Sequence, residues 1–407
     1  MTELEGRIEI NLRCDGGHVA DLSIVNHRLT QAGRMFVGRR PDEVTAMLPL
    51  LFSLCGHAQL VAGLEALEQA AGQIPDPDTL KARRLMVAAE TVLEQTQSVL
   101  RDWPALLGEE ADMAAARGLR AALGSLRGAL YPDRDWARLG GGRLQPDIPE
   151  LTRRLGEARR LIESAIFVGP TGYVLGDPRN WSDWARTGAT AAARLVRHME
   201  DQDLGGLGAS PVPSLPPLDR TILEARLKED DGRFLARPDW LGVPHLTHPL
   251  GRRANHPVVA AMLLTYGSGV LSLIAARLAD LQACLDEAEE LVAMIPPSPD
   301  QKATLTPPLS RQRERENKGL GLVEAARGLR VHRVELADGL IARYQILAPT
   351  EWNFHPNGAL AHGLRGLACG DTLEVQARLL VSALDPCVAY TINKVGDPCG
   401  VEAQRGG

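Results

Sequence analysis

The sequence predicts an α+β fold that is mainly α, with long helices and small antiparallel β hairpins. Aromatic residues make up only 4% of the 407 residues, against 44% hydrophobic residues in total. The core must therefore consist mainly of Leu, Ala, Val and Ile, which favours helices. Long stretches have apolar residues three or four positions apart, as helices do, and two segments alternate with period two around turn residues. The length permits one large domain or two or three smaller ones.

The first predicted element is a β hairpin over residues 7–25. Residues 7–12 alternate between apolar and polar side chains, and residues 19–25 return as the partner strand. Between them, Asp15-Gly16-Gly17 supplies residues that tolerate the positive φ angles of a tight turn.

A helical body is predicted over residues 41–294. Its first helix begins near Pro41 and continues past Cys55, which would face inward, toward Leu67. Further helices rich in Ala, Leu and Arg are predicted between clusters of Pro, Gly and Asp, at residues 79–101, 110–130 and 147–166.

The second half of this body contains a break and a long helix. Residues 205–217 are rich in Gly and Pro, so they are predicted to form a loop or linker. A helical pattern then covers residues 256–294, with a bend expected at Gly267 and Gly269. Residues 296–317 are polar and are expected at the surface.

The clearest hairpin lies in the C-terminal third. Residues 330–336 and 340–347 both alternate with period two, and Asp338-Gly339 joins them. An Asp-Gly pair suits the two-residue turn whose twist matches that of the flanking strands.

Composition argues against several classes of partner. The formal net charge of −6 is spread along the chain without a long basic run, so nucleic acid is not an expected partner. The N-terminal residues resemble no targeting peptide, and no apolar run reaches the roughly 18 residues of a membrane helix. We therefore expect a cytoplasmic protein without membrane insertion. Six cysteines without tight spacing are expected to be thiols rather than a disulfide framework.

Most cysteines and histidines of the chain have an ordinary structural explanation. Cys14, Cys284 and Cys369 are each expected to be a small buried hydrophobic residue. Cys399 repeats the Asp-Pro-Cys sequence of Cys387, but in a glycine-rich tail that is expected to fray. Three histidines at positions 245, 248 and 256 are expected to lie in a loop, since prolines separate them and a fourth ligand is missing.

Several short motifs share one order and one family. They are Cys55-Gly56, Glu324-Ala-Ala-Arg-Gly328 followed by His332, Tyr344-Gln-Ile-Leu-Ala-Pro-Thr-Glu-Trp-Asn353, and Asp385-Pro386-Cys387, with Glu5-Gly6 and Asp15-Gly-Gly-His-Val19 near the N-terminus. These motifs resemble the signatures of nickel-iron hydrogenase large subunits, densely from Glu324 to Asn393 and loosely from about Ala71 to Leu241. The resemblance implies that family's long-helix bundle as a single domain over residues 1–407. The site would lie in residues 322–393, followed by a tail over residues 394–407.

The departures from the family fall on its metal ligands. In that family four thiolates hold nickel, and two of them also bridge to an iron that carries cyanide and carbon monoxide. Here the second cysteine of each pair is replaced, by Ala58 and Tyr390, and the terminal histidine by Asn393. Because nickel of this type requires soft sulfur ligands, no nickel and no hydrogen catalysis are expected.

The surroundings of the iron are kept. By resemblance, Arg327, Pro349 and Thr350 occupy the positions that contact the cyanide and carbonyl ligands. A guanidinium and a hydroxyl can each donate a hydrogen bond to a cyanide nitrogen. Cys55 and Cys387 are therefore the candidate metal ligands, for a transient Fe(CN)2(CO) group. They match the family's terminal nickel ligands rather than its bridging ones, so either the iron is displaced or the two cysteines serve another purpose.

This pattern resembles the HupK or HoxV type of hydrogenase accessory protein. That resemblance implies a non-catalytic scaffold or carrier, with HypC- and HypD-type maturation chaperones and the hydrogenase large subunit as partners. His57 could orient or activate the Cys55 thiolate or be an ordinary polar residue, and Glu5 and Asp385 are further supporting candidates. The alternatives are a metal-free adaptor that docks chaperones or subunits, and, less favoured, a working hydrogenase.

Overall fold

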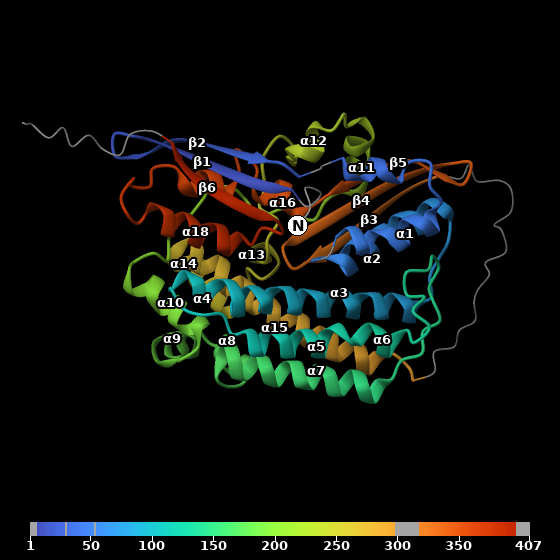
Figure 1. Ribbon diagram of the computed structural model, residues 1–407, viewed down its shortest axis with the longest axis horizontal. Helices are drawn as coiled ribbons and strands as arrows, with labels where there is room; N and C mark the ends of the chain where they lie inside the picture. Colours follow the sequence, from blue (N-terminus) through green and yellow to red (C-terminus); the bar gives the residue numbers. More distant parts are fainter. Residues whose placement is uncertain (1–5, 29–30, 53, 298–316, 396–407) are drawn as a thin grey trace, which may run out of the picture.

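Two small sheets lie on one side of a layer of long helices in this computed structural model (Figure 1). The structure describes residues 6–28, 31–52, 54–297 and 317–395. Glu5, Cys399 and most of the predicted surface segment 296–317 lie outside these residues. In Figure 1 the sheets occupy the upper part of the molecule, and α3 (Pro77–Gln97), α15 (Val270–Met294) and α7 (Ile148–Ile162) run below them.

The remaining elements complete this arrangement. The strands are β1 Arg7–Asp15, β2 His18–Asn26, β3 Lys318–Ala325, β4 Gly328–Ala337, β5 Leu340–Leu347 and β6 Ala389–Val395. The other helices are α1 Pro41–Leu51, α2 Gly56–Ala71, α4 Trp103–Leu106, α5 Met113–Gly124, α6 Leu126–Leu130, α8 Thr171–Gly176, α9 Pro178–Thr187, α10 Ala191–Asp201, α11 Arg220–Glu229, α12 Arg233–Ala236, α13 Pro249–Arg252, α14 Pro257–Tyr266, α16 Pro349–Asn353, α17 Ala359–Leu364 and α18 Leu373–Leu384.

The helical layer confirms the expected mainly α fold. The helices predicted at residues 79–101, 110–130 and 147–166 correspond to α3, to α5 with α6, and to α7, and α3 and α7 each continue into a π-helical turn. Aspartates at positions 76, 112 and 147 accept hydrogen bonds from backbone N–H groups at the starts of α3, α5 and α7, which satisfies amides that have no partner within the helix. Leu, Ala and Val side chains dominate the large core between these helices.

Two predicted helices are divided. The helix expected from Pro41 through Cys55 ends at Leu51, and α2 begins at Gly56, so Cys55 sits at a helix start rather than within a helix. The long pattern over residues 256–294 is interrupted by Gly267, whose φ of +58° is readily adopted by glycine. The predicted bend is therefore a break between α14 and α15.

The sheet β3-β4-β5 contains the predicted C-terminal hairpin. Asp338 and Gly339, with φ of +52° and +78°, form the turn between β4 and β5, as expected for a two-residue hairpin turn. The strand β3 was not predicted. Its two glycines, Gly319 and Gly321, face α2 so closely that an added Cβ would lie 1.9 and 2.0 Å from backbone oxygens of that helix. The sheet thus packs on α2 through backbone, with α11 and α12 over its other face (Figure 1).

The other sheet, β2-β1-β6, joins the two ends of the chain. The predicted N-terminal hairpin is present as β1 and β2, and β6 pairs with β1 in parallel. We did not predict β6, since its partner is nearly the whole chain away. Part of the expected tail, Lys394 and Val395, belongs to this strand.

A disulfide corrects the expectation that all cysteines are thiols. Cys14 in β1 is bonded to Cys369, 355 residues away in the sequence. Backbone hydrogen bonds from Val19 to Leu367 and from Cys369 to Gly17 hold the two segments side by side. Spacing in the sequence could not show this proximity, and so the two cysteines were wrongly expected to be isolated hydrophobic residues. Cys55, Cys284 and Cys387 are free thiols.

Candidate functional site

Cys55 is held at the N-terminal end of α2. The Glu90 carboxylate on α3 accepts hydrogen bonds from the backbone N–H groups of His57 and Ala58, at 2.7 and 3.0 Å. A carboxylate is favourable there because it satisfies free amides and complements the positive end of the helix dipole. Glu90 therefore fixes where α2 begins, and with it the buried Cys55.

A chain of buried side chains connects Cys55 to the β3-β4-β5 sheet. The amide nitrogen of Gln59 lies 3.9 Å from the Cys55 sulfur, and its oxygen lies 2.6 Å from Nε2 of His332 in β4. Nδ1 of His332 lies 2.8 Å from the Tyr344 hydroxyl in β5. Burial lowers the pKa of His332 well below its usual value, so the ring stays neutral and acts as part of the support of α2.

Cys387 lies just beyond the end of α18. This helix ends at Asp385, which has the left-handed φ of +52°, and two residues later the Cys387 sulfur lies 3.1 Å from the Thr350 hydroxyl. Thr350 is buried in the first turn of α16. Pro349 precedes it at the start of that helix, where its fixed φ and missing N–H are favourable.

Arg327 lies in the tight turn between β3 and β4 and is already paired. Its Nε donates to the Asp385 carbonyl oxygen at 2.9 Å and lies 3.1 Å from that residue's carboxylate, and its Nη1 lies 3.2 Å from the Glu94 carboxylate. Asn353 donates to the Arg327 carbonyl oxygen at 3.1 Å. Burial raises the pKa of Glu94 to about 7, against the opposing charge of Arg327. Asp385 thus holds Arg327 in place.

Two arginines that the sequence did not single out also act on the thiols. Arg28, beyond β2, donates to the Glu351 carboxylate at 2.8 Å, and Arg330 lies in β4 with 2% of its surface exposed. The positive charges of both affect the ionisation of Cys387, together with that of Arg327. The signal for Arg330 was present: in a strand of period two it shares a face with His332, which the sequence had marked.

The two thiols differ in ionisation. Burial disfavours both thiolates, but for Cys387 the charges of Arg28 and Arg327 and the Thr350 hydroxyl outweigh it, so its pKa is lowered. For Cys55, burial is the largest influence and raises the pKa, and the negative charge of Cys387 raises it further. The positive charge of Arg330 acts in the opposite direction but does not outweigh them. Cys387 therefore loses its proton more readily than Cys55. The site formed by these two cysteines with Thr350, Arg327, Arg28 and Arg330 is called the thiol pocket below.

This difference predicts the order of alkylation. When the protein is treated with iodoacetamide at increasing pH, Cys387 should react at a lower pH than Cys55, because the thiolate is the nucleophile and the pKa of Cys387 is lowered while that of Cys55 is raised. Peptide mass spectrometry identifies each cysteine. Thr350→Val removes a hydrogen bond to the thiolate and should shift the Cys387 profile to higher pH. Labelling of Cys55 before Cys387 would contradict this assignment.

Ala58, Tyr390 and Asn393, which stand where the hydrogenase family has further metal-binding residues, have structural roles in this protein. Ala58 is fully buried and packs against Val323 of β3. Tyr390 pairs with Ile8 in the parallel β1–β6 ladder, and the exposed Asn393 donates to Asn11 at 2.8 Å. Within the described ranges no cluster of three or more His, Cys, Asp or Glu side chains is arranged to hold a metal ion. Two thiols are the donors that the pocket offers.

His57 is directed away from Cys55. Its Nδ1 lies 3.2 Å from the Glu90 carboxylate, and its ring packs edge-on against Trp136 with 5.3 Å between centroids. Of the three histidines near residue 250, His245 bonds to the Val243 carbonyl, His248 accepts the N–H of Leu250 and begins α13, and His256 precedes α14. His245 and His256 thus serve the local chain, whereas Nε2 of His248 also lies 3.1 Å from the Ala383 carbonyl oxygen in α18.

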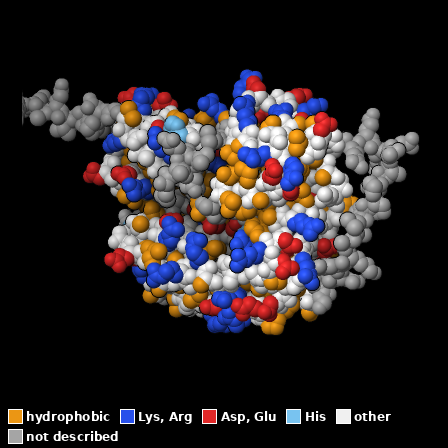
Figure 2. Space-filling model, turned by 45° about the vertical axis from the view of Figure 1, so that its right-hand side comes forward, with side chains coloured by type: hydrophobic (Ala, Val, Ile, Leu, Met, Phe, Trp, Pro, Cys, Tyr) orange, Lys and Arg blue, Asp and Glu red, His pale blue; other side chains and the backbone are white. Residues whose placement is uncertain are grey.

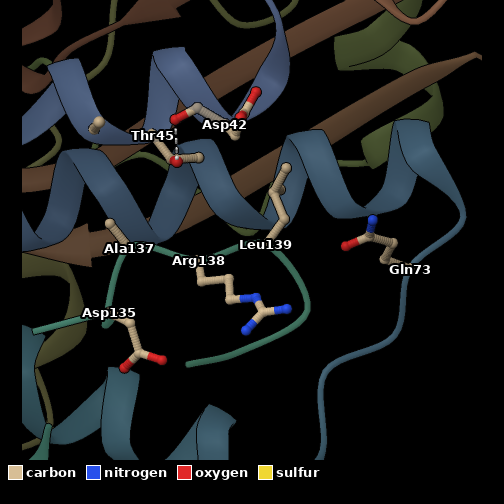
Figure 3. A pocket seen from close by; sticks show the side chains of 8 residues that line it. Asp42, Thr45, Gln73, Asp135, Ala137, Arg138 and Leu139 are labelled. Carbon is tan, nitrogen blue, oxygen red and sulfur yellow. Dashed lines mark hydrogen bonds between the residues drawn. The ribbon is translucent and has the colours of Figure 1, made fainter. Parts of the chain in front are cut away.

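One hollow of the surface lies apart from the predicted site residues. This hollow, between α1 and the segment after α6, is lined by Asp42, Asp135 and Arg138 (Figure 3), and contains none of the predicted site residues. Acidic and basic side chains are interspersed on the face drawn in Figure 2. Of the helices described, none has both the length and the apolar character to cross a bilayer.

Comparison with known proteins first defines the class. The fold resembles that of the Ni-Fe-Se hydrogenase from D. vulgaris Hildenborough, with a TM-score of 0.66 and 16% identity over 92% of this chain and 94% of that one. The family described as nickel-dependent hydrogenase matches residues 260–392. This chain therefore has the fold of a nickel-iron hydrogenase large subunit, with two of the four cysteine positions occupied by cysteine.

The relatives then define the family. The hydrogenase expression/formation protein HoxV of Cupriavidus necator is 30% identical over 91% of this chain and 92% of its own length. The hydrogenase expression/formation protein HupK of Bradyrhizobium diazoefficiens is 30% identical over 95% and 96%. The chain belongs to this family of HupK- and HoxV-type hydrogenase expression/formation proteins.

Proposed function

We propose that this protein is a non-catalytic scaffold or carrier that holds the Fe(CN)2(CO) group between Cys55 and Cys387 during hydrogenase maturation. The observation that carries the proposal is the meeting of these two thiols, from opposite ends of the chain, with the Arg327 turn and the Thr350 hydroxyl. The names of the relatives support a role in hydrogenase formation.

The donors present fit an iron group that brings its own diatomic ligands. Two thiolates and three diatomic ligands account for five positions around iron, whereas the four-thiolate nickel site of the family has lost two donors. The Arg327 guanidinium and the Thr350 hydroxyl are hydrogen-bond donors that act on Cys387, and the Thr350 hydroxyl can rotate its hydrogen from sulfur to a cyanide nitrogen. Soft thiolate is a suitable ligand for such a metal group.

Loading the site requires every proton still held by the two thiols to leave. Two iron–sulfur bonds form, each such proton passes to solvent, and water or the thiolates of a donor protein leave the iron with their electron pairs. Metal ligands must be deprotonated, so binding releases protons. Cys387, whose pKa is lowered, would bind first, and Cys55 would close the site.

The proposed partners follow from the cargo. HypC- and HypD-type chaperones would deliver the iron group, and the hydrogenase large subunit would receive it, in the cytoplasm, where thiols are kept reduced. The Cys14–Cys369 disulfide includes neither Cys55 nor Cys387. Reduction of this disulfide in the cytoplasm would therefore not alter the two site thiols.

Infrared spectroscopy tests the proposal. Protein purified from cells that express the hydrogenase accessory genes should show cyanide and carbonyl stretches, with about one iron and no nickel per chain. The double variant Cys55→Ser, Cys387→Ser should lose both the iron and the bands, because serine is a poor ligand for this soft site. The matched control is Cys284→Ser, which changes a buried thiol of α15 outside the pocket and should keep them. Absent bands in wild type, with unchanged hydrogenase maturation in the double variant, would refute the proposal.

A metal-free adaptor is the second candidate, favoured by exposed apolar side chains beside the site. Leu50 in the last turn of α1 is 82% exposed and Leu54, next to Cys55, is 40% exposed, and such residues are candidates for partner contact. If the protein is only an adaptor, Leu50→Asp should reduce hydrogenase maturation while both cysteine variants remain silent. A working hydrogenase, the less favoured reading, would instead contain stoichiometric nickel and take up hydrogen with an artificial acceptor.

A further inference from the structure

Arg330 is a buried cation with two side-chain nitrogens that have no partner among the described residues. Only 2% of it is exposed, yet its Nε and Nη1 atoms have no hydrogen-bond partner in the part of the chain that the structure describes. Arg333, three residues later in β4 and equally buried, lies 3.2 Å from the Gln345 oxygen and 2.5 Å from the Glu335 carboxylate. An uncompensated buried charge is strongly unfavourable, and polar groups in a protein interior are usually paired. The fold by itself therefore does not account for Arg330.

The side chain of Arg330 shares the face of β4 that α2 covers. Side chains two residues apart in a strand point to the same side, and His332, two residues on, bonds to Gln59 of α2. Gln59 lies one turn after Cys55, so Arg330 lies toward the end of α2 that carries the thiol. In agreement, the Arg330 charge is the largest influence that favours the Cys55 thiolate.

The other arginines of the pocket already have counter-charges. Arg327 is paired with Glu94 and Asp385, and Arg28 with Glu351. Of these three cations, Arg330 is the one whose charge no carboxylate in the described chain neutralises. Within the described residues, the groups whose negative charge Arg330 favours are therefore the two thiols rather than a carboxylate.

We propose that Arg330 is the anion-recognition residue of the thiol pocket and donates from Nε and Nη1 to the terminal atoms of an anionic ligand. The identity of that anion rests on the proposed function, in which the acceptors are cyanide nitrogens. Ferrous iron with two cyanides, carbon monoxide and two thiolates carries a net double negative charge, which a guanidinium can partly neutralise within the protein. Arg330 would then favour the cyanide-bearing group over a bare ferrous ion, which is positively charged.

Stability separates this role from a structural one. Replacing an unpaired buried cation by an apolar residue of similar size is neutral or stabilising, whereas breaking a paired one is destabilising. Arg330→Leu should therefore melt at or above the temperature of the wild-type apoprotein, and Arg333→Leu on the same strand should melt below it. If both variants lose stability equally, Arg330 is a structural residue and the proposal is overturned.

Ligand binding supplies the second readout. Thiocyanate, a linear anion with a nitrile end, should bind the wild-type apoprotein and shift its infrared nitrile band. Arg330→Leu should bind it about 10-fold or more weakly, because a hydrogen bond to a charged group is lost, and Arg330→Lys should recover part of the affinity. Full affinity in Arg330→Leu would overturn the proposal.

Infrared spectra of protein isolated with its iron group distinguish the Arg330 proposal from the proposed carrier function. If wild type carries cyanide and carbonyl bands and Arg330→Leu retains them unshifted at full iron content, the Arg330 proposal fails while the carrier function stands. If wild type shows no such bands but thiocyanate binding depends on Arg330, the anion-recognition role of Arg330 is supported and the proposed iron cargo is refuted.

Discussion

Asp280→Ala is expected to lower the free energy of unfolding by about 3–5 kcal/mol, the usual cost of removing one partner from a buried ion pair. Asp280 on α15 is fully buried and accepts from Arg252 at 2.6 and 2.8 Å, from Arg253 at 2.9 Å and from Gln95 of α3 at 2.7 Å. Burial alone would raise its pKa, but the two arginines lower it, so the carboxylate is charged at neutral pH. Its loss would leave two arginines without their main counter-charge.

The effect should extend to the site. Arg252 also donates to the Ala325 carbonyl oxygen at 2.9 Å, at the end of β3 and two residues before Arg327. Chemical denaturation at neutral pH measures the stability, and the alkylation profile of Cys387 reports the site. The matched control is Glu287→Ala on the same helix, because its pair with Arg84 is exposed and should contribute less than about 1 kcal/mol. An equally small loss for Asp280→Ala would refute the assignment.

Gly321→Ala is expected to lower the free energy of unfolding by about 1–3 kcal/mol or more, since overpacking forces backbone to move. A Cβ at this position would lie 2.0 Å from the carbonyl oxygen of Ala62 in α2, so the helix and β3 must separate. Separation would weaken the contact of His332 with Gln59 and shift Cys55. We therefore expect lower stability in denaturation experiments and faster alkylation of Cys55.

Gly128→Ala provides the comparison. An added Cβ at Gly128 in α6 meets no atom within 4 Å, and alanine is a better helix former than glycine by up to about 1 kcal/mol. This variant should be as stable as wild type or more so. If Gly321→Ala behaves like Gly128→Ala, the close packing of α2 on β3 does not position the thiol.

The sequence predicted the main parts of the pocket but not its charge. Cys387, Thr350 and Arg327 were marked by motifs, and the structure brings the Thr350 hydroxyl to Cys387 and the Arg327 charge into the same pocket. No motif marks Arg28, and although Arg330 shares a strand face with His332, the alternation of that strand does not show that the face lies near the thiols. Arg28 follows the end of β2 and Arg330 lies near the start of β4, and the distances from these points to the thiols are not written in local sequence.

The roles of the Glu90 and Glu94 carboxylates could not be predicted from local sequence either. Glu90 and Glu94 lie four residues apart on α3, one helical turn, where sequence shows only two acidic residues in a helix. In the fold, Glu90 accepts the first amides of α2 and Glu94 faces Arg327. For His57 the sequence left open whether it supports the Cys55 thiolate or is an ordinary polar residue, and in the fold its Nδ1 lies 3.2 Å from the Glu90 carboxylate.

Local patterns by themselves determined the helical layer, the hairpins and the candidate thiols, because helix periodicity, turn chemistry and short motifs depend on neighbouring residues. Only the tertiary structure decided which distant segments meet: β6 beside β1, Cys14 bonded to Cys369, and Arg330 buried near Cys55 without a counter-charge. These features depend on contacts between segments up to several hundred residues apart. Such contacts are set by the packing of the whole chain and leave no periodic signal in the sequence.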